Sequence, residues 1–103
     1  MIRILLACAS GMSTSMVVKN MEKAAKDQKI DAKIWAVPEV EVENEKDHVD
    51  VVLLGPQVSF LQTEVQKAVG DKVPVGVINM IDYGRMDGKK VLQQALDLIG
   101  GRK

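Results

Sequence analysis

The chain has 103 residues, 47% of them hydrophobic and 27% charged, a balance typical of a soluble globular protein and not of a disordered one. Fourteen basic residues match fourteen acidic ones, and the aromatic residues are one Trp, one Tyr and one Phe. Nucleic-acid binding needs a basic face or several stacking rings, so we exclude nucleic acid as a partner. The length favours a single domain covering 1–103.

The start of the chain carries the sequence Leu5-Leu6-Ala7-Cys8, which superficially resembles a lipoprotein cleavage site. A signal peptide needs a basic stretch and an apolar segment of roughly 7–15 residues before that site. Only seven residues precede Cys8. With one cysteine, no internal disulfide can form. We therefore expect a cytoplasmic protein that is not itself inserted in a membrane.

Short apolar runs alternate with longer segments of helical period, which predicts an α/β fold with a parallel sheet. The predicted strands cover residues 2–7, 32–37, 49–54 and 73–78. The predicted helices cover 13–28, a short acidic segment at 39–47, the region around 58–68, and 88–99.

The composition of the strands predicts their order. The first and third are nearly continuous apolar runs, as in strands buried on both faces, whereas Lys33 in the second and Pro74 in the fourth are typical of sheet edges. Right-handed crossovers then favour one open four-stranded sheet of order 2-1-3-4 with helices on both faces. Because ligands bind where such an order reverses, the loops at 8–14 and 55–57 should face each other at the site.

The loop after the first strand begins with Cys8 and continues as Ala9-Ser10-Gly11-Met12-Ser13-Thr14-Ser15 into a helix. Gly11 can turn backbone N–H groups toward an anion, and the hydroxyls at 13–15 add donors. A helix N-terminus favours both a thiolate and a bound phosphate. A lone cysteine is more often a small buried hydrophobic residue. Its place at a strand end nevertheless favours a nucleophile that attacks phosphorus.

Three separated motifs resemble the lactose/cellobiose-type IIB proteins of the sugar phosphotransferase system. Residues 8–15 are similar to that family's phosphocysteine loop, usually Cys-Ser-Ala-Gly-Met-Ser-Thr-Ser, with Ala9 and Ser10 exchanged. Residues 50–57 (DVVLLGPQ) resemble the family's third strand and turn, and residues 83–88 (YGRMDG) resemble its Tyr-Gly-x-x-Asp-Gly. The length and the order of the elements agree over essentially the whole chain.

The resemblance implies a phosphorelay with a phosphate loop like that of low-molecular-weight phosphatases. Cys8 would accept a phosphoryl group from a phosphohistidine of the IIA protein and pass it to a sugar bound by the membrane permease IIC. The sugar would be a β-linked disaccharide such as cellobiose or diacetylchitobiose, and neither a metal nor a cofactor is expected. The implied phosphate-binding loop consists of Ala9, Ser10, Gly11, Met12, Ser13, Thr14 and Ser15.

Other classes of protein use related loops or sheets. A low-molecular-weight tyrosine-phosphatase-like hydrolase is the main alternative, but its chemistry requires an arginine six residues after the cysteine, where this chain has Thr14. A receiver module would have an aspartate where Gly55 stands. A flavin-binding module would need an aromatic side chain in the loop to stack on the ring. Both modules rank below the phosphocarrier.

Three further polar residues are expected on the rim of the site. Gln57 follows the third strand and either contacts the phosphate or merely begins a helix. Tyr83 and Asp87 follow the fourth strand and either shape a partner surface or, for Asp87, cap the last helix. His48 precedes the third strand, at the opposite end of the sheet, and is expected to be a surface residue.

Overall fold

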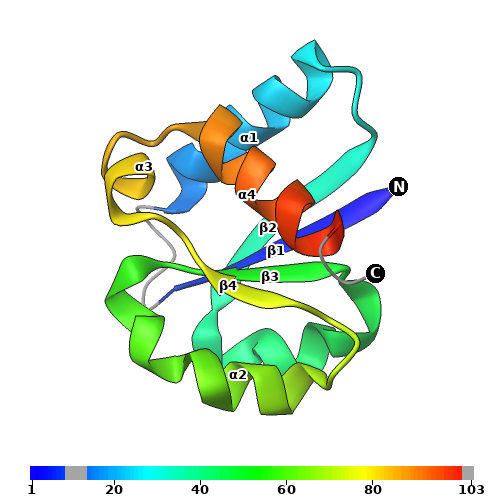
Figure 1. Ribbon diagram of the computed structural model, residues 1–103, viewed down its shortest axis with the longest axis vertical. Coiled ribbons are helices and arrows are strands. Elements are labelled where there is room, and N and C mark those ends of the chain that lie inside the picture. The colour runs from blue at the N-terminus through cyan, green and yellow to red at the C-terminus, as the bar shows by residue number, and fades with distance from the viewer. Residues whose placement is uncertain (9–13, 101–103) are drawn as a thin grey trace.

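The computed structural model describes residues 1–8 and 14–100, which form a parallel sheet with helices on both faces (Figure 1). The strands are β1 (Ile2–Cys8), β2 (Ala32–Pro38), β3 (Val51–Leu54) and β4 (Val75–Val77). No helix in this part of the chain is long and apolar enough to cross a membrane. The helices are α1 (Thr14–Asp27), α2 (Gln62–Val69), α3 (Met80–Gly84) and α4 (Gly88–Gly100), with 3-10 helices η1 (Glu39–His48) and η2 (Pro56–Leu61).

The sheet has the order β2-β1-β3-β4, which confirms the predicted topology. β1 pairs with β2 along its whole length and with β3 from Ile4 to Ala7. All four residues of β3 are fully buried, because helices cover both faces of the sheet. The reversal of strand order between β1 and β3 places the expected site at the carboxyl end of β1.

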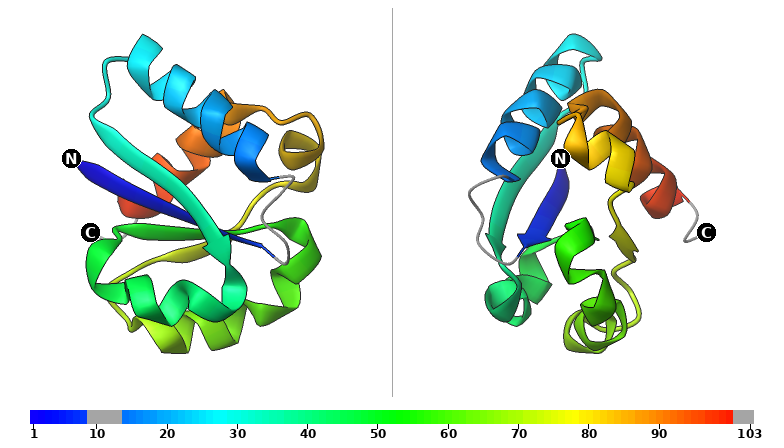
Figure 2. Two further views of the ribbon diagram at one scale, coloured as in Figure 1. Left: turned by 180° about the vertical axis from the view of Figure 1, so that it is seen from behind. Right: turned by 90° about the vertical axis from the view of Figure 1, so that its left-hand side faces the viewer.

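Two helical layers cover the sheet, as the right-hand view of Figure 2 shows. Alternate side chains of a strand point to opposite faces, so Ile4 and Leu6 pack under α1 and α4 while Leu5 and Ala7 pack against the other layer. That second layer is built from η1, η2 and α2. The protein therefore has two apolar cores, one on each face of the sheet.

The contact between α1 and α4 depends on Gly88. A Cβ atom there would lie 2.2 Å from the carbonyl carbon of Asn20, so no larger residue fits without moving a helix backbone. The side-chain nitrogen of Asn20 also donates a hydrogen bond to the carbonyl of Met86, at 2.7 Å. The Asp-Gly pair that precedes the last helix is thus held against α1.

The structure differs from the predicted elements at several places. Strand β3 begins at Val51, later than predicted, because the 3-10 helix η1 continues to His48 and Val49 follows as its C-cap.

Helix α3 was not predicted. Asn79 begins it, since its side-chain oxygen accepts hydrogen bonds from the backbone nitrogens of Ile81 (2.9 Å) and Asp82 (3.2 Å). A five-residue helix with exposed apolar residues carries too little periodicity to be recognised in the sequence.

Candidate functional site

Cys8 is the last residue of β1 and is buried, with 3% of its surface exposed. In the neighbouring strand its register partner is Pro38, the last residue of β2. On the other side, the backbone nitrogen of Gly55 donates a hydrogen bond to the carbonyl of Ala7, at 2.9 Å. The thiol-bearing residue is therefore held at the centre of the sheet's carboxyl edge, with the segment after β3 directly beside it.

The space beside Cys8 is available because residue 55 has no side chain. A Cβ atom on Gly55 would lie 3.6 Å from Cβ of Cys8 and 3.0 Å from Oε1 of Gln57. The φ angle of Gly55 is −62°, which any residue adopts, so the backbone conformation does not require glycine here, and the tightest contact of an added Cβ atom would be with the flexible Gln57 side chain. Gln57 folds its amide back over Gly55, on the same rim as Cys8.

Most of the predicted phosphate-binding loop lies outside the residues that the structure describes. The loop residues outside that range are Ala9, Ser10, Gly11, Met12 and Ser13. Helix α1 begins at Thr14 and includes Ser15. Its first turn contains no acidic residue, so the helix's own first turn places no carboxylate against the partial positive charge of its N-terminus. The end of α1 nearest Cys8 in the chain is electrostatically suited to an anion.

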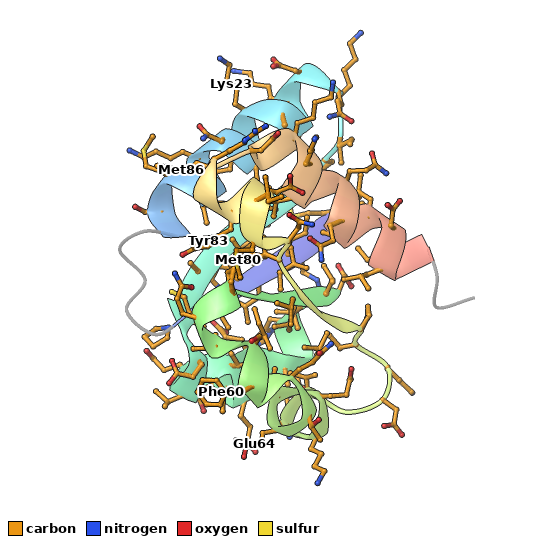
Figure 3. The ribbon with its side chains drawn as sticks, turned by 60° about the vertical axis from the view of Figure 1, so that its left-hand side comes forward. Lys23, Phe60, Glu64, Met80, Tyr83 and Met86 are labelled. Carbon is orange, nitrogen blue, oxygen red and sulfur yellow. The ribbon has the colours of Figure 1, made fainter. Side chains whose placement is uncertain are left out.

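A hollow of about 340 Å³ lies on the same rim and brings the second and third motifs together. We call it the rim hollow; it is lined by Pro56, Gln57, Met80, Tyr83 and Gly84. Tyr83 is buried at 8% exposure, whereas Met80 is 75% exposed at its mouth. Figure 3 shows Met80 and Tyr83 close together on α3, above the η2 segment. Gln57 and Tyr83, expected on one rim, share this hollow.

Asp87 caps a helix and does not line the rim hollow. Its Oδ1 accepts a hydrogen bond from the backbone nitrogen of Lys90 at 3.2 Å, and its carbonyl accepts one from Val91 at 3.0 Å. These are the bonds of an N-cap residue at the start of α4. His48 is exposed and precedes β3, at the amino end of the sheet, as expected.

Sequence reasoning missed the exposed apolar residues of α3. Met80 and Ile81 are 75% and 64% exposed, and Met86 after the helix is 42% exposed. The available signal was Asn79, a strong N-cap residue directly before them. Exposed methionines around a hollow are typical of adaptable contact surfaces.

The comparison with known families decides the assignment. Residues 3–94 match the model of the family described as "PTS system, Lactose/Cellobiose specific IIB subunit". The chain belongs to this family. IIB components are sugar phosphotransferases of the phosphotransferase system (PTS) and work with IIA and IIC partners.

Curated relatives agree over almost the whole chain. The oligo-β-mannoside-specific EIIB component of Bacillus subtilis (strain 168) is 46% identical, covering 94% of this chain and 95% of its own length. The cellobiose-specific EIIB component of Lactococcus lactis subsp. lactis (strain IL1403) is 47% identical, covering 93% and 94%. The galactose-specific EIIB component of Lactococcus lactis subsp. cremoris (strain MG1363) is 46% identical, with the same coverage.

Solved structures agree with the fold. The solution structure of a cellobiose-specific phosphotransferase IIB component from Borrelia burgdorferi superposes with a TM-score of 0.81 at 43% identity, covering 99% of this chain and 94% of that one. The lactose-specific IIB domain from Streptococcus pneumoniae superposes with a TM-score of 0.80 at 16% identity, covering 94% and 96%. The second likeness concerns the fold alone.

Proposed function

We propose that Cys8 is the residue that carries the phosphoryl group in this IIB protein. The observation that supports this most directly is its position: a cysteine at the carboxyl end of the central strand β1, with Gly55 directly beside it. This is the point where the strand order reverses and where open α/β sheets bind ligands. The chain continues from Cys8 into the N-terminus of α1, a favourable environment for phosphate.

The proposed relay has two transfers. In the first, the sulfur of Cys8 attacks the phosphorus of a phosphohistidine on IIA, so that the P–N bond breaks, an S–P bond forms and the thiol proton passes to the imidazole. In the second, a sugar hydroxyl bound by IIC attacks the same phosphorus, so that the S–P bond breaks and the hydroxyl proton returns to the thiol. Both steps occur without oxidation or reduction, in the cytoplasm.

The surrounding residues receive separate roles. The backbone of residues 9–15 would surround the phosphoryl oxygens, as the family resemblance implies. Gln57 would place its amide beside the bound group, because it lies over Gly55 next to Cys8. Tyr83 would form the wall of the rim hollow that contacts a partner protein. Asp87 would act only through the N-cap of α4.

The sugar proposed from the resemblance is a β-linked disaccharide such as cellobiose or diacetylchitobiose. Relatives named for oligo-β-mannoside, cellobiose and galactose share 46%, 47% and 46% identity with this chain, so overall identity does not rank these sugars. The permease holds the sugar, so transfer assays with membranes bearing different permeases would identify it.

The test is phosphorylation by the general phosphorelay proteins and the cognate IIA, followed by intact-protein and peptide mass spectrometry. The wild-type protein should gain one phosphoryl group on Cys8, and Cys8→Ser should fold normally and gain none. Labelling of Cys8→Ser at any other residue would contradict the assignment.

A phosphatase-like hydrolase is the alternative that shares this chemistry. It predicts rapid, Cys8-dependent hydrolysis of para-nitrophenyl phosphate by the wild-type protein. The carrier predicts negligible hydrolysis and a phosphoprotein stable enough to isolate, because no arginine stands at position 14 to stabilise attack by water.

A further inference from the structure

A groove of about 270 Å³ runs between η1 and α2, in the helical layer opposite α1 and α4. We call it the acidic groove. Its floor includes the buried residues Val42 and Val65. Val40, which lines the groove, is 79% exposed, and Phe60, which precedes the lining residue Leu61, is 77% exposed. The groove is lined by Glu39, Val40, Val42, Glu43, Leu61, Glu64, Val65 and Ala68.

The charged residues that line the acidic groove are all carboxylates: Glu39, Glu43 and Glu64. The whole chain has a formal net charge of zero. Within η1, however, five acidic residues accompany a single lysine, Lys46. η1 thus carries an excess of negative charge beside an exposed apolar surface, a combination that suits a basic amphipathic partner.

Glu39 adds an independent observation. Its Oε2 atom is buried and, within the described residues, has no hydrogen-bond partner. An unpaired buried carboxylate oxygen is unfavourable, and a Lys or Arg side chain from a partner would satisfy it. The groove therefore contains a buried acceptor for which the described part of the chain supplies no donor.

The acidic groove begins at the rim that carries Cys8. Pro38 is the register partner of Cys8, and Glu39 is the next residue of the chain. Figure 3 shows Phe60 and Glu64 below the sheet, whereas Met80, Tyr83 and Met86 lie above it. A partner seated in the groove would approach Cys8 from the side of the sheet opposite α3.

We propose that the acidic groove binds a basic segment on the cytoplasmic face of the IIC permease. The proposal rests on the proposed function of Cys8, because IIC must bring its sugar to that residue. Cytoplasmic loops of membrane proteins are enriched in Lys and Arg, so the permease presents the charge that complements the groove. Exposed Val40 and Phe60 would pack against the apolar part of the same segment.

The experiment measures the two transfers separately. The variant combines Glu39→Gln, Glu43→Gln and Glu64→Gln, which removes three charges while keeping the side-chain volumes. With membrane vesicles bearing the permease, the KM for the phosphorylated IIB protein should rise by about tenfold at low ionic strength. The difference from wild type should shrink as salt is added. Phosphorylation of Cys8 by IIA should proceed with unchanged KM and kcat.

A matched control removes the same number of charges from exposed positions outside the groove: Glu22→Gln, Asp71→Asn and Asp97→Asn. This control should leave both transfers unchanged. Should the triple groove variant unfold, Glu64→Gln alone, at an exposed position, should still raise the membrane KM. An unchanged membrane KM, or a raised KM for IIA instead, would overturn the proposal. If Cys8 were not the carrier, the wild-type protein would gain no phosphoryl group on Cys8 from IIA, whatever the membrane KM, so this failure is distinguishable from failure of the groove proposal.

Discussion

Gly55 lies beside Cys8, where a Cβ atom on residue 55 would be in van der Waals contact with Cβ of the cysteine, at 3.6 Å. The backbone nitrogen of Gly55 donates to Ala7, the residue before Cys8, at 2.9 Å. The same Cβ atom would lie 3.0 Å from Oε1 of Gln57. Gly55 is therefore a neighbour of both the thiol-bearing residue and the Gln57 amide.

Gly55→Ala tests this arrangement. The backbone of Gly55 accepts alanine, so the free energy of unfolding should change by no more than about 1 kcal/mol. The methyl group would displace the Gln57 amide, and phosphorylation of Cys8 by IIA should slow by about tenfold. Single-turnover labelling measures this rate. Gly100→Ala, at the end of α4 and outside the rim hollow, is the control, because a Cβ atom there meets no atom within 4 Å. Equal rates for the two variants would show that the Gly55 contact does not matter.

Thr14→Arg tests whether the missing arginine preserves the phosphoprotein. A guanidinium at this position could stabilise the charge that develops during attack by water, a contribution worth a factor of about 10²–10³ in comparable sites. The phosphorylated variant should lose its label to water faster than wild type, and relay to the sugar should fall. Thr14→Lys provides a cation without the two-pronged geometry and should have a smaller effect. A lifetime equal to that of wild type in a folded, phosphorylated variant would contradict the prediction.

Asp87→Ala separates capping from chemistry. Loss of the bond from the Lys90 nitrogen should lower stability by about 1 kcal/mol, the usual cost of removing an N-cap. For a chain of this size the Tm should fall by roughly 5 °C. Asp87→Ser retains a capping oxygen and should recover most of that loss. Both variants should accept phosphate from IIA at the wild-type rate at a temperature where they are folded; a slow but stable Asp87→Ser would indicate a chemical role.

The pair of Arg3 and Asp50 predicts a pH dependence of stability. The guanidinium Nη2 of Arg3 lies 3.2 Å from Oδ1 of Asp50, and the backbone nitrogen of Arg3 donates to Oδ2 at 2.8 Å. The side-chain hydrogen bond from Arg3 is the largest cause that lowers the pKa of Asp50 below its usual value. A carboxylate whose pKa is lower in the folded state stabilises that state above its unfolded pKa, about 3.9, and this contribution is lost as the pH falls through the folded pKa.

Urea unfolding of wild type and Asp50→Asn at a series of pH values measures this contribution. The wild-type protein should be more stable at pH 7, and the difference should shrink once the pH falls below about 4. Both proteins share the other carboxylates, so their difference isolates Asp50. A difference that is the same at every pH would contradict the assignment.

The sequence by itself determined the sheet and the position of Cys8. Burial on both faces requires continuous apolar runs, and β1 and β3 carry them, while Lys33 and Pro74 indicated the edge strands correctly. These features are local, because they depend on which face of a strand meets a helix and on which residues an edge tolerates. The strand order alone brings Cys8 and Gly55 to neighbouring positions at the carboxyl edge of the sheet.

Only the tertiary structure decided how the remaining rim residues divide their roles. The same local pattern of a polar residue before a helix describes Gln57 and Asp87, yet the first shares the rim hollow with Tyr83 and the second caps α4. The acidic groove likewise joins residues of η1 and α2 that lie about twenty positions apart in the chain. Such contacts depend on how separate helices pack onto one sheet, because this packing determines which helix faces meet. Hydrophobic periodicity in the sequence indicates only that a helix has a buried face, not which element that face contacts.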